Sequence, residues 1–200
     1  MVSNKSPVKW PNVPDVYNWL VLDERGNWLI KKEKIFHKGL IDFINAQYTV
    51  DDKGRWFFQN GPQRVFVTLE YTPYVLTLAS HDSVIYFKTQ TNENVETIDK
   101  LWIDNKGRLL VSWESNIGLV CDRDLPLLAD KLSHNNKSID QMDPNELASI
   151  RHQIPSGGET SLTLMMNRKT YNIFFIDEVE VSKLFSFNLK PNPPDGDPDC

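Results

Sequence analysis

The side chains best suited to binding chemistry lie close together in one stretch of the chain. Arg64, Thr68 and Glu70 alternate on one face of a predicted strand, and Arg55 lies on the neighbouring arm of the same hairpin. Together they offer guanidinium, hydroxyl and carboxylate groups around Phe66, which would suit a small polar ligand or a peptide strand. The alternative is an ordinary solvated face with cross-strand ion pairs, each contributing roughly 0.2–1 kcal/mol.

Motifs for catalysis, metal binding and phosphate binding are missing from the sequence. There is no Gly-x-Ser-x-Gly elbow, no pair of His or Cys residues at metal-ligand spacing, and no glycine-rich phosphate loop. Cys121 follows an apolar run and is best interpreted as a small buried residue. We therefore expect no catalytic residue, no metal site and no cofactor.

One segment keeps an enzymatic alternative open. Residues 133–161 are long and polar for a loop, and they contain His134, Asp143 and His152. A short capped helix is predicted to open at Asp143. An active site assembled from this loop is the rival to a binding function.

Charge and composition limit the class of protein. The 22 Lys and Arg residues against 27 Asp and Glu give a formal net charge of −5, which argues against a nucleic-acid partner. The N-terminus lacks the apolar core of a secretory signal, and no run of residues is apolar enough to span a membrane. With two cysteines and no plausible bridge between them, we expect a cytoplasmic protein that contacts no membrane.

Prolines mark the ends of the globular part. Residues 1–13 are expected to form an N-terminal arm, and residues 188–200, rich in Pro and Asp, a disordered tail. Between them, a polar stretch near residue 90 divides a first α+β subdomain, 14–90, from a second, 91–187.

A short pattern recurs three times within this region. Asp23, Asp51 and Asp104 each begin an Asp-x-x-Gly segment that leads into a bulky apolar residue. Asp can hydrogen-bond the backbone ahead of it, and Gly supplies a positive φ, so the pattern is typical of hairpin turns. A cation site is the alternative, but further carboxylates at EF-hand spacing are lacking.

The hydrophobic patterns predict the remaining elements. Strands are indicated by alternation over 65–71, 109–113, 162–166 and 171–175, and helices by apolar spacing near 40–48, 125–132 and 178–187. We therefore predict an α+β fold of mostly antiparallel sheets, built from repeated hairpin units with a few packed helices.

The order and spacing of these residues resemble a bacterial family, domain of unknown function 1285. The resemblance covers about residues 20–115 and rests on Gly26-x-Trp28-Leu, Ile35-x-His37-x-x-Leu40, Gly54-x-Trp56-Phe and Arg64-Val65-x-Val67 with Pro73-Tyr74-Val75. It implies a bacterial α+β protein with repeated motifs and a suggested role in signal transduction. It implies no catalytic residue.

These observations favour a non-enzymatic binding or regulatory module. Its partner would be a small molecule or another protein, which the sequence does not identify, and the oligomeric state is also undetermined. A structural subunit of a larger assembly is a further alternative, and it would display a large exposed apolar patch.

Overall fold

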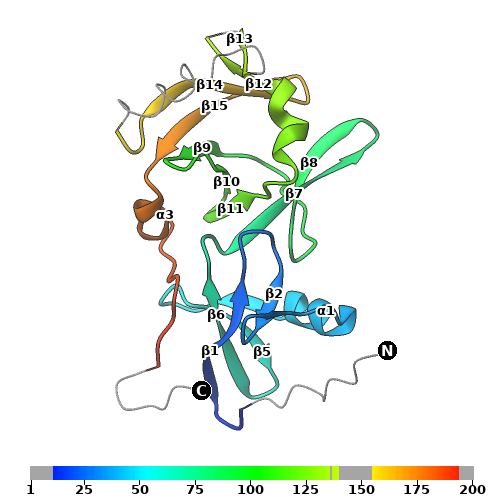
Figure 1. Cartoon of the computed structure of the whole chain (residues 1–200), viewed down its shortest axis with the longest axis vertical. Coiled ribbons are helices and arrows are strands. Elements are labelled where there is room, and N and C mark those ends of the chain that lie inside the picture. The colour runs from blue at the N-terminus through cyan, green and yellow to red at the C-terminus, as the bar shows by residue number, and fades with distance from the viewer. Residues whose placement is uncertain (1–10, 136, 140–154, 194–200) are drawn as a thin grey trace.

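Two β-sheets arranged end to end form the body of the molecule. The computed structural model describes residues 11–135, 137–139 and 155–193. The first sheet lies in the lower half of Figure 1 and the second in the upper half. Three short helices within the described residues accompany them, namely α1 (Lys38–Ala46), η1 (Leu125–Lys131) and α3 (Glu178–Leu184).

The first sheet has six strands in the order β3-β2-β1-β6-β5-β4. Their bounds are β1 (Asp15–Leu22), β2 (Trp28–Ile30), β3 (Glu33–Lys34), β4 (Tyr48–Val50), β5 (Trp56–Asn60) and β6 (Gln63–Leu69). The second sheet has nine strands in the order β13-β12-β14-β15-β9-β10-β11-β7-β8. Their bounds are β7 (Tyr74–His81), β8 (Val84–Thr89), β9 (Lys100–Asp104), β10 (Leu109–Trp113), β11 (Asn116–Val120), β12 (Leu132–His134), β13 (Lys137–Ser138), β14 (Glu159–Met166) and β15 (Lys169–Ile176).

Both sheets are mixed, with parallel as well as antiparallel pairs, so the prediction of mostly antiparallel sheets built from repeated hairpin units is not confirmed in that form. Strand β1 pairs in parallel with β6, β7 with β11, and β9 with β15. Each of these pairs joins strands that are distant in the sequence, so turn patterns between neighbouring strands gave no sign of them. The chain is thus mostly β with short helices, which agrees with the broader α+β class.

Three loops share one hydrogen-bond pattern; they join β1 to β2, β4 to β5, and β9 to β10. In each loop one oxygen of the leading Asp accepts hydrogen bonds from the N–H groups two and four residues later, at 2.7–3.0 Å. The other oxygen accepts from the side chain four residues later. The Asp side chains therefore stabilise the loops themselves, and within the described residues no group of acidic, His or Cys side chains could hold a metal ion.

A hydrophobic core runs continuously from one sheet to the other. Buried side chains of β1, β5 and β6 pack with Trp102, Leu110, Ile117 and Leu119 of the second sheet. A second cluster lies within the larger sheet and includes Leu76, Phe87 and Leu164. Strands β7 and β8 precede residue 90 but belong to the larger sheet. The division of the chain into two subdomains near residue 90 stays a prediction.

The chain after α3 crosses back from the second sheet to the first, visible in Figure 1 as the segment descending from α3. We name residues Phe185–Lys190 the C-terminal strap. Asn188 N–H donates to Gly54 O at 2.8 Å, and Leu69 N–H donates to Leu189 O at 2.8 Å. Asn188 and Leu189 thus contact the first sheet and its β4–β5 loop, although the predicted disordered tail begins at residue 188. The remainder of that predicted tail, 194–200, lies outside the described residues.

No helix among the described residues is both long and apolar enough to cross a membrane. Asp143 and His152, and the helix predicted to open at Asp143, lie outside the described residues. The structure therefore describes only part of the segment 133–161, and an active site in that segment stays a prediction.

Candidate functional site

Strands β5 and β6 bring two of the predicted binding residues together. The guanidinium carbons of Arg55 and Arg64 lie 4.6 Å and 5.3 Å from the ring centre of Phe66. Tyr17 of β1 stacks on the same ring at 4.6 Å, and the ring of Phe57 of β5 lies 5.6 Å from it, centre to centre. We name these five residues the arginine–aromatic face; it is the side of the first sheet opposite the main core.

Both arginines of this face are paired with carboxylates. Arg64 donates to the two carboxylate oxygens of Asp15 at 2.8 Å and 2.7 Å, and Arg55 donates to Asp51 at 2.7 Å. Such charge-assisted bonds, and the bidentate pair of Arg64 above all, are among the strongest hydrogen bonds that side chains form. The positive charges of this face are therefore balanced by carboxylates. This is the arrangement expected of an ordinary outer face with ion pairs, the alternative given in the sequence analysis.

The other two predicted residues lie further along β6. Thr68 pairs with Val21 of β1 and is half-buried. Glu70 follows the end of the strand and accepts a hydrogen bond from Glu24 N–H at 3.1 Å, which directs it toward the β1–β2 loop. The structure thus joins Arg55 with Arg64 and places Glu70 in a separate contact, so a binding role for the four residues stays a prediction.

Two opposing effects act on the pKa of the Asp51 carboxyl. Burial raises its pKa, but hydrogen bonds from the Arg55 side chain and from the N–H groups of Arg55 and Lys53 outweigh burial, so the pKa lies below its ordinary value. A carboxyl whose pKa is depressed in the folded state stabilises the fold above its unfolded pKa. That stabilisation is lost as the pH falls through the folded pKa.

We expect Asp51→Asn to lower the free energy of unfolding by about 1–2 kcal/mol at pH 7, since it removes charge-assisted hydrogen bonds. The difference from the natural chain should shrink in acid, as the pH falls below the ordinary range of an aspartate pKa and Asp51 itself becomes protonated. Urea denaturation at a series of pH values measures both effects. Asp52→Asn, at the exposed neighbouring position, is the control, and a pH-independent difference for Asp51→Asn would contradict the assignment.

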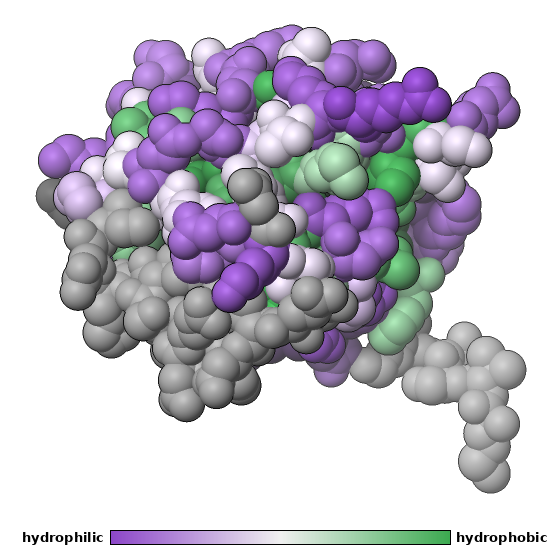
Figure 2. All heavy atoms as spheres, turned by 90° about the horizontal axis from the view of Figure 1, so that it is seen from above, coloured by the Kyte–Doolittle hydropathy of each residue, from purple (hydrophilic) through white to green (hydrophobic). Residues whose placement is uncertain are grey.

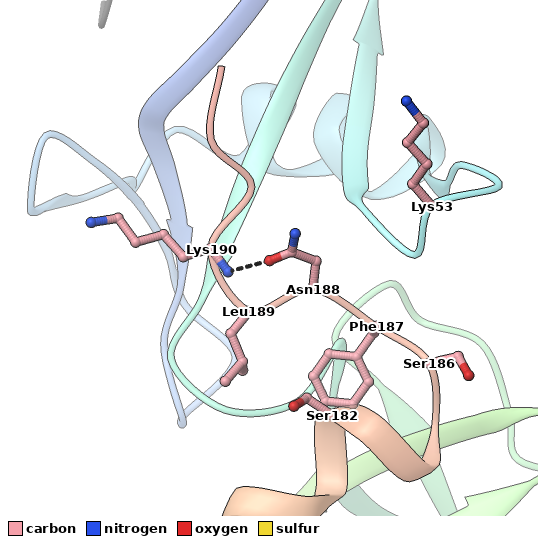
Figure 3. A pocket seen from close by; sticks show the side chains of 7 residues that line it. All are labelled: Lys53, Ser182, Ser186, Phe187, Asn188, Leu189 and Lys190. Carbon is pink, nitrogen blue, oxygen red and sulfur yellow. Dashed lines mark hydrogen bonds between the residues drawn. The ribbon is translucent and has the colours of Figure 1, made fainter. Parts of the chain in front are cut away.

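A hollow of about 640 Å³ opens beside the C-terminal strap. We name it the strap hollow; it is lined by Lys53, Ser182, Ser186, Phe187, Asn188, Leu189 and Lys190. In Figure 3, Asn188 lies between the two lysines, and Phe187 and Leu189 point to the opposite side of the strap. Asn188 Oδ1 accepts the Lys190 N–H at 3.0 Å, which fixes the turn of the strap at this point.

A second hollow of about 250 Å³ lies next to the strap hollow and shares Ser186 and Phe187 with it. Trp56 and Ile117 contribute apolar surface, and Asp52 contributes a carboxylate. The loop between β4 and β5 borders both hollows. Ligand sites are frequently found where structural layers meet, and both hollows lie where the strap joins the two sheets.

Arg108 makes the densest polar network among the described residues. It donates to Asp104 at 2.7 Å, to Glu24 at 2.6 Å and to Glu178 at 2.6 Å, and its guanidinium lies 3.6 Å from the ring centre of Tyr71. Tyr71 also donates to Asp104 at 2.8 Å. Burial, followed by the charge of Asp104 and this bond, raises the pKa of Tyr71, so its hydroxyl remains a donor. The network ties the β1–β2 loop to β9, β10 and α3.

The sequence analysis missed both the strap hollow and the Arg108 network. The signal for Arg108 was present, because Arg55 and Arg108 occupy the same position after Asp-x-x-Gly. The sequence from residue 188 onward gave the opposite signal, since the prolines that follow the strap indicated disorder. Hydrogen bonds with Gly54 and Leu69, which are distant in the sequence, place Asn188 and Leu189.

Comparison with known proteins places the chain in a family. The model of family DUF2944, described as "Protein of unknown function (DUF2946)", matches residues 2–192. The chain belongs to this family of unknown function. No curated protein matches it.

Two solved structures show similarity to the chain, and both are DUF1285 family proteins. The one from Shewanella baltica OS155 has 12% identity and a TM-score of 0.41, with 54% of this chain and 87% of that chain covered. The one from Silicibacter pomeroyi DSS-3 has 13% identity and a TM-score of 0.46, with 66% and 84% covered. They come from the family that the sequence was found to resemble.

Proposed function

We propose that this chain is a non-enzymatic binding module that takes a small anionic ligand in the strap hollow. The observation that carries the proposal is the pair Lys53 and Lys190, which are far apart in the sequence and flank Asn188 beside a hollow of about 640 Å³. Ammonium groups attract phosphate or carboxylate as point charges, and an amide supplies a donor that orients the ligand.

A ligand at this place would contact both halves of the molecule. Lys53 belongs to the loop between two strands of the first sheet, and Ser182 belongs to α3, which packs on the second. Binding would therefore stabilise the position of the strap between the sheets. This supports a regulatory role, in which ligand occupancy is transmitted as a change in how firmly the strap is held.

Thermal unfolding against a panel of compounds tests the proposal. The panel contains phosphate, pyrophosphate, nucleotides, cyclic dinucleotides, di- and tricarboxylates and divalent metals. A ligand at a hundredfold excess over its Kd stabilises the native state by about 2.7 kcal/mol, which raises the melting temperature of a chain of this size by roughly 5–10 °C. We expect an anion to produce this shift, and Lys53→Gln with Lys190→Gln to abolish it.

Lys137→Gln, at an exposed lysine of β13, is the matched control and should leave the shift unchanged. Arg64→Ala provides a second arm, because Arg64 is the more exposed arginine of the arginine–aromatic face, with 39% of its side chain accessible. A shift lost only in Arg64→Ala would place the ligand on that face. A panel without any anion-dependent shift, or a shift that survives both lysine changes, would overturn the strap hollow as the site.

The assembly-subunit alternative predicts a large exposed apolar patch. Among the described residues, the exposed large apolar side chains are instead spread over strands, helices and loops: Phe36, Phe43, Val50, Val84, Leu127, Met165, Val179, Leu184 and Leu189. The face of the molecule seen from above in Figure 2 is mainly hydrophilic, with separate small apolar areas. This distribution favours a binding module over a subunit held by a broad apolar interface.

A further inference from the structure

The turn between β2 and β3 has an unusual sequence for its geometry. Ile30 pairs with Glu33, so Lys31 and Lys32 form a two-residue turn, and both have positive φ, 48° and 69°. Two-residue turns with positive φ at both positions favour Asn, Asp and Gly. A lysine side chain is strained in this left-handed region.

Two other two-residue turns of the molecule begin with residues that this geometry favours. Asp82-Ser83 joins β7 to β8 and Asn167-Arg168 joins β14 to β15, and all four residues have positive φ. Each of these turns begins with Asp or Asn, whose short polar side chains tolerate the conformation. Lys31-Lys32 contains neither. The Lys31 ammonium lies 4.0 Å from the ring centre of Trp19, which accounts for the first lysine, so the second requires a separate reason. Residues in sparsely populated backbone conformations cluster at functional sites.

The surroundings of the turn supply that reason. Phe36 is 80% exposed, the highest value among the large apolar residues, and the Lys34 ammonium lies 5.6 Å from its ring centre. Lys38, at the start of α1, is also exposed, with 85% of its side chain accessible. We name Lys31, Lys32, Lys34, Phe36 and Lys38 the basic tip; it adjoins α1, which lies at the outer side of the first sheet in Figure 1.

We propose that the basic tip docks on a folded protein partner whose surface has an apolar pocket for Phe36 within an acidic rim. The four lysines outnumber the two carboxylates beside them, Glu33 and Asp42, on a chain that is acidic overall. Charge complementarity therefore selects an acidic surface. A protruding aromatic ring needs a concave site, and aromatic side chains that fill a pocket are typical interface anchors.

The charge balance favours a protein over an anionic bilayer. Attraction to acidic lipids grows with the number of basic residues at the surface, and the excess here is small. One aromatic side chain adds little insertion into the bilayer, and stable attachment generally requires two strong signals. A protein pocket can enclose the ring fully and place a carboxylate beside each ammonium.

Site-specific photo-crosslinking in the cells that make the protein tests this proposal. Phe36 is replaced by p-benzoylphenylalanine, and the same residue at Val179 is the matched control, because Val179 is 75% exposed but lies between Glu178 and Glu180. We expect position 36 to link to a protein through a segment rich in Asp and Glu. Lys32→Glu with Lys34→Glu should lower that yield about tenfold, equivalent to roughly 1.4 kcal/mol.

A turn variant separates docking from folding. Lys31→Asn with Lys32→Gly supplies the residues that the turn geometry favours, so we expect a higher melting temperature together with a lower crosslink yield. Links to a segment that is not acidic, to lipid or to a second copy of the chain would overturn the proposal. A yield that does not respond to charge reversal, or that does not exceed the yield at position 179, would also overturn it.

Discussion

Gly54→Ala is expected to lower the free energy of unfolding by about 3–5 kcal/mol and to release the C-terminal strap. A Cβ at this position would lie 2.2 Å from the backbone oxygen of Ser186, with φ at +70°. A backbone oxygen cannot rotate away as a flexible side chain can, so the strap itself must move. The loss combines about 1–2 kcal/mol of left-handed strain, about 1 kcal/mol for the hydrogen bond from Asn188, and part of the burial of Phe187.

Gly26→Ala is the matched control for this prediction. Gly26 occupies the same position in the first Asp-x-x-Gly loop and has φ +78°, but a Cβ there would meet side-chain atoms at an ordinary 3.4 Å. The loss of stability in Gly26→Ala should therefore reflect only the strain of the left-handed conformation. Urea denaturation measures both variants, and hydrogen exchange at the amides of Asn188 and Leu69 reports the strap directly. Equal losses in the two variants would show that the strap contact contributes nothing.

The sequence predicts those features of the fold that depend on neighbouring residues. Alternation along β6 correctly separates Val65 and Val67, which face the core, from Arg64 and Phe66 on the opposite side. The strands predicted over 162–166 and 171–175 are also present, as β14 and β15, and they pair as a hairpin with a two-residue turn. In both cases the pattern is local, because side-chain direction and turn geometry are set within a few residues.

Contacts between distant segments were beyond the sequence. Four other strands lie between β1 and β6 in the sequence. Their parallel pairing produces no periodic residue pattern in either strand from which it could be predicted. The residues from 188 onward include few apolar side chains, so composition indicated disorder there, yet Asn188 and Leu189 form hydrogen bonds with the first sheet and its β4–β5 loop. Of the predicted binding residues, Arg55 and Arg64 share a hairpin and were placed together, whereas Glu70 extends to a loop that only the three-dimensional fold brings near.

Arg108→Met is expected to lower the free energy of unfolding by about 3–5 kcal/mol, because it removes the cation from a buried carboxylate. The Asp104 side chain is 0% exposed and that of Arg108 is 16% exposed, so water cannot replace the lost bonds without opening the structure. Glu24 and Glu178 lose the same partner. Since these residues belong to the β1–β2 loop and α3, the variant should weaken contact between the sheets as well as the loop itself.

The neighbouring ion pair of Arg25 with Asp122 is the control, because it also joins the β1–β2 loop to the second sheet. Its side chains are 61% and 54% exposed, and we expect Arg25→Met to cost no more than about 1 kcal/mol. Urea denaturation compares the two. If Arg108→Met does not fold, Arg108→Lys keeps the charge without the forked geometry and should show an intermediate loss.

The double variant Arg108→Met with Asp104→Asn decides between charge and packing as the source of the effect. If the unpaired carboxylate dominates, neutralising it should return part of the lost stability, so the two changes together cost less than their sum. If the stacking of the guanidinium on Tyr71 dominates, the losses should add, because Asp104→Asn does not restore that contact. A strictly additive result would therefore assign the role of Arg108 to its contact with the ring, and a saving of more than about 1 kcal/mol would assign it to the buried charge.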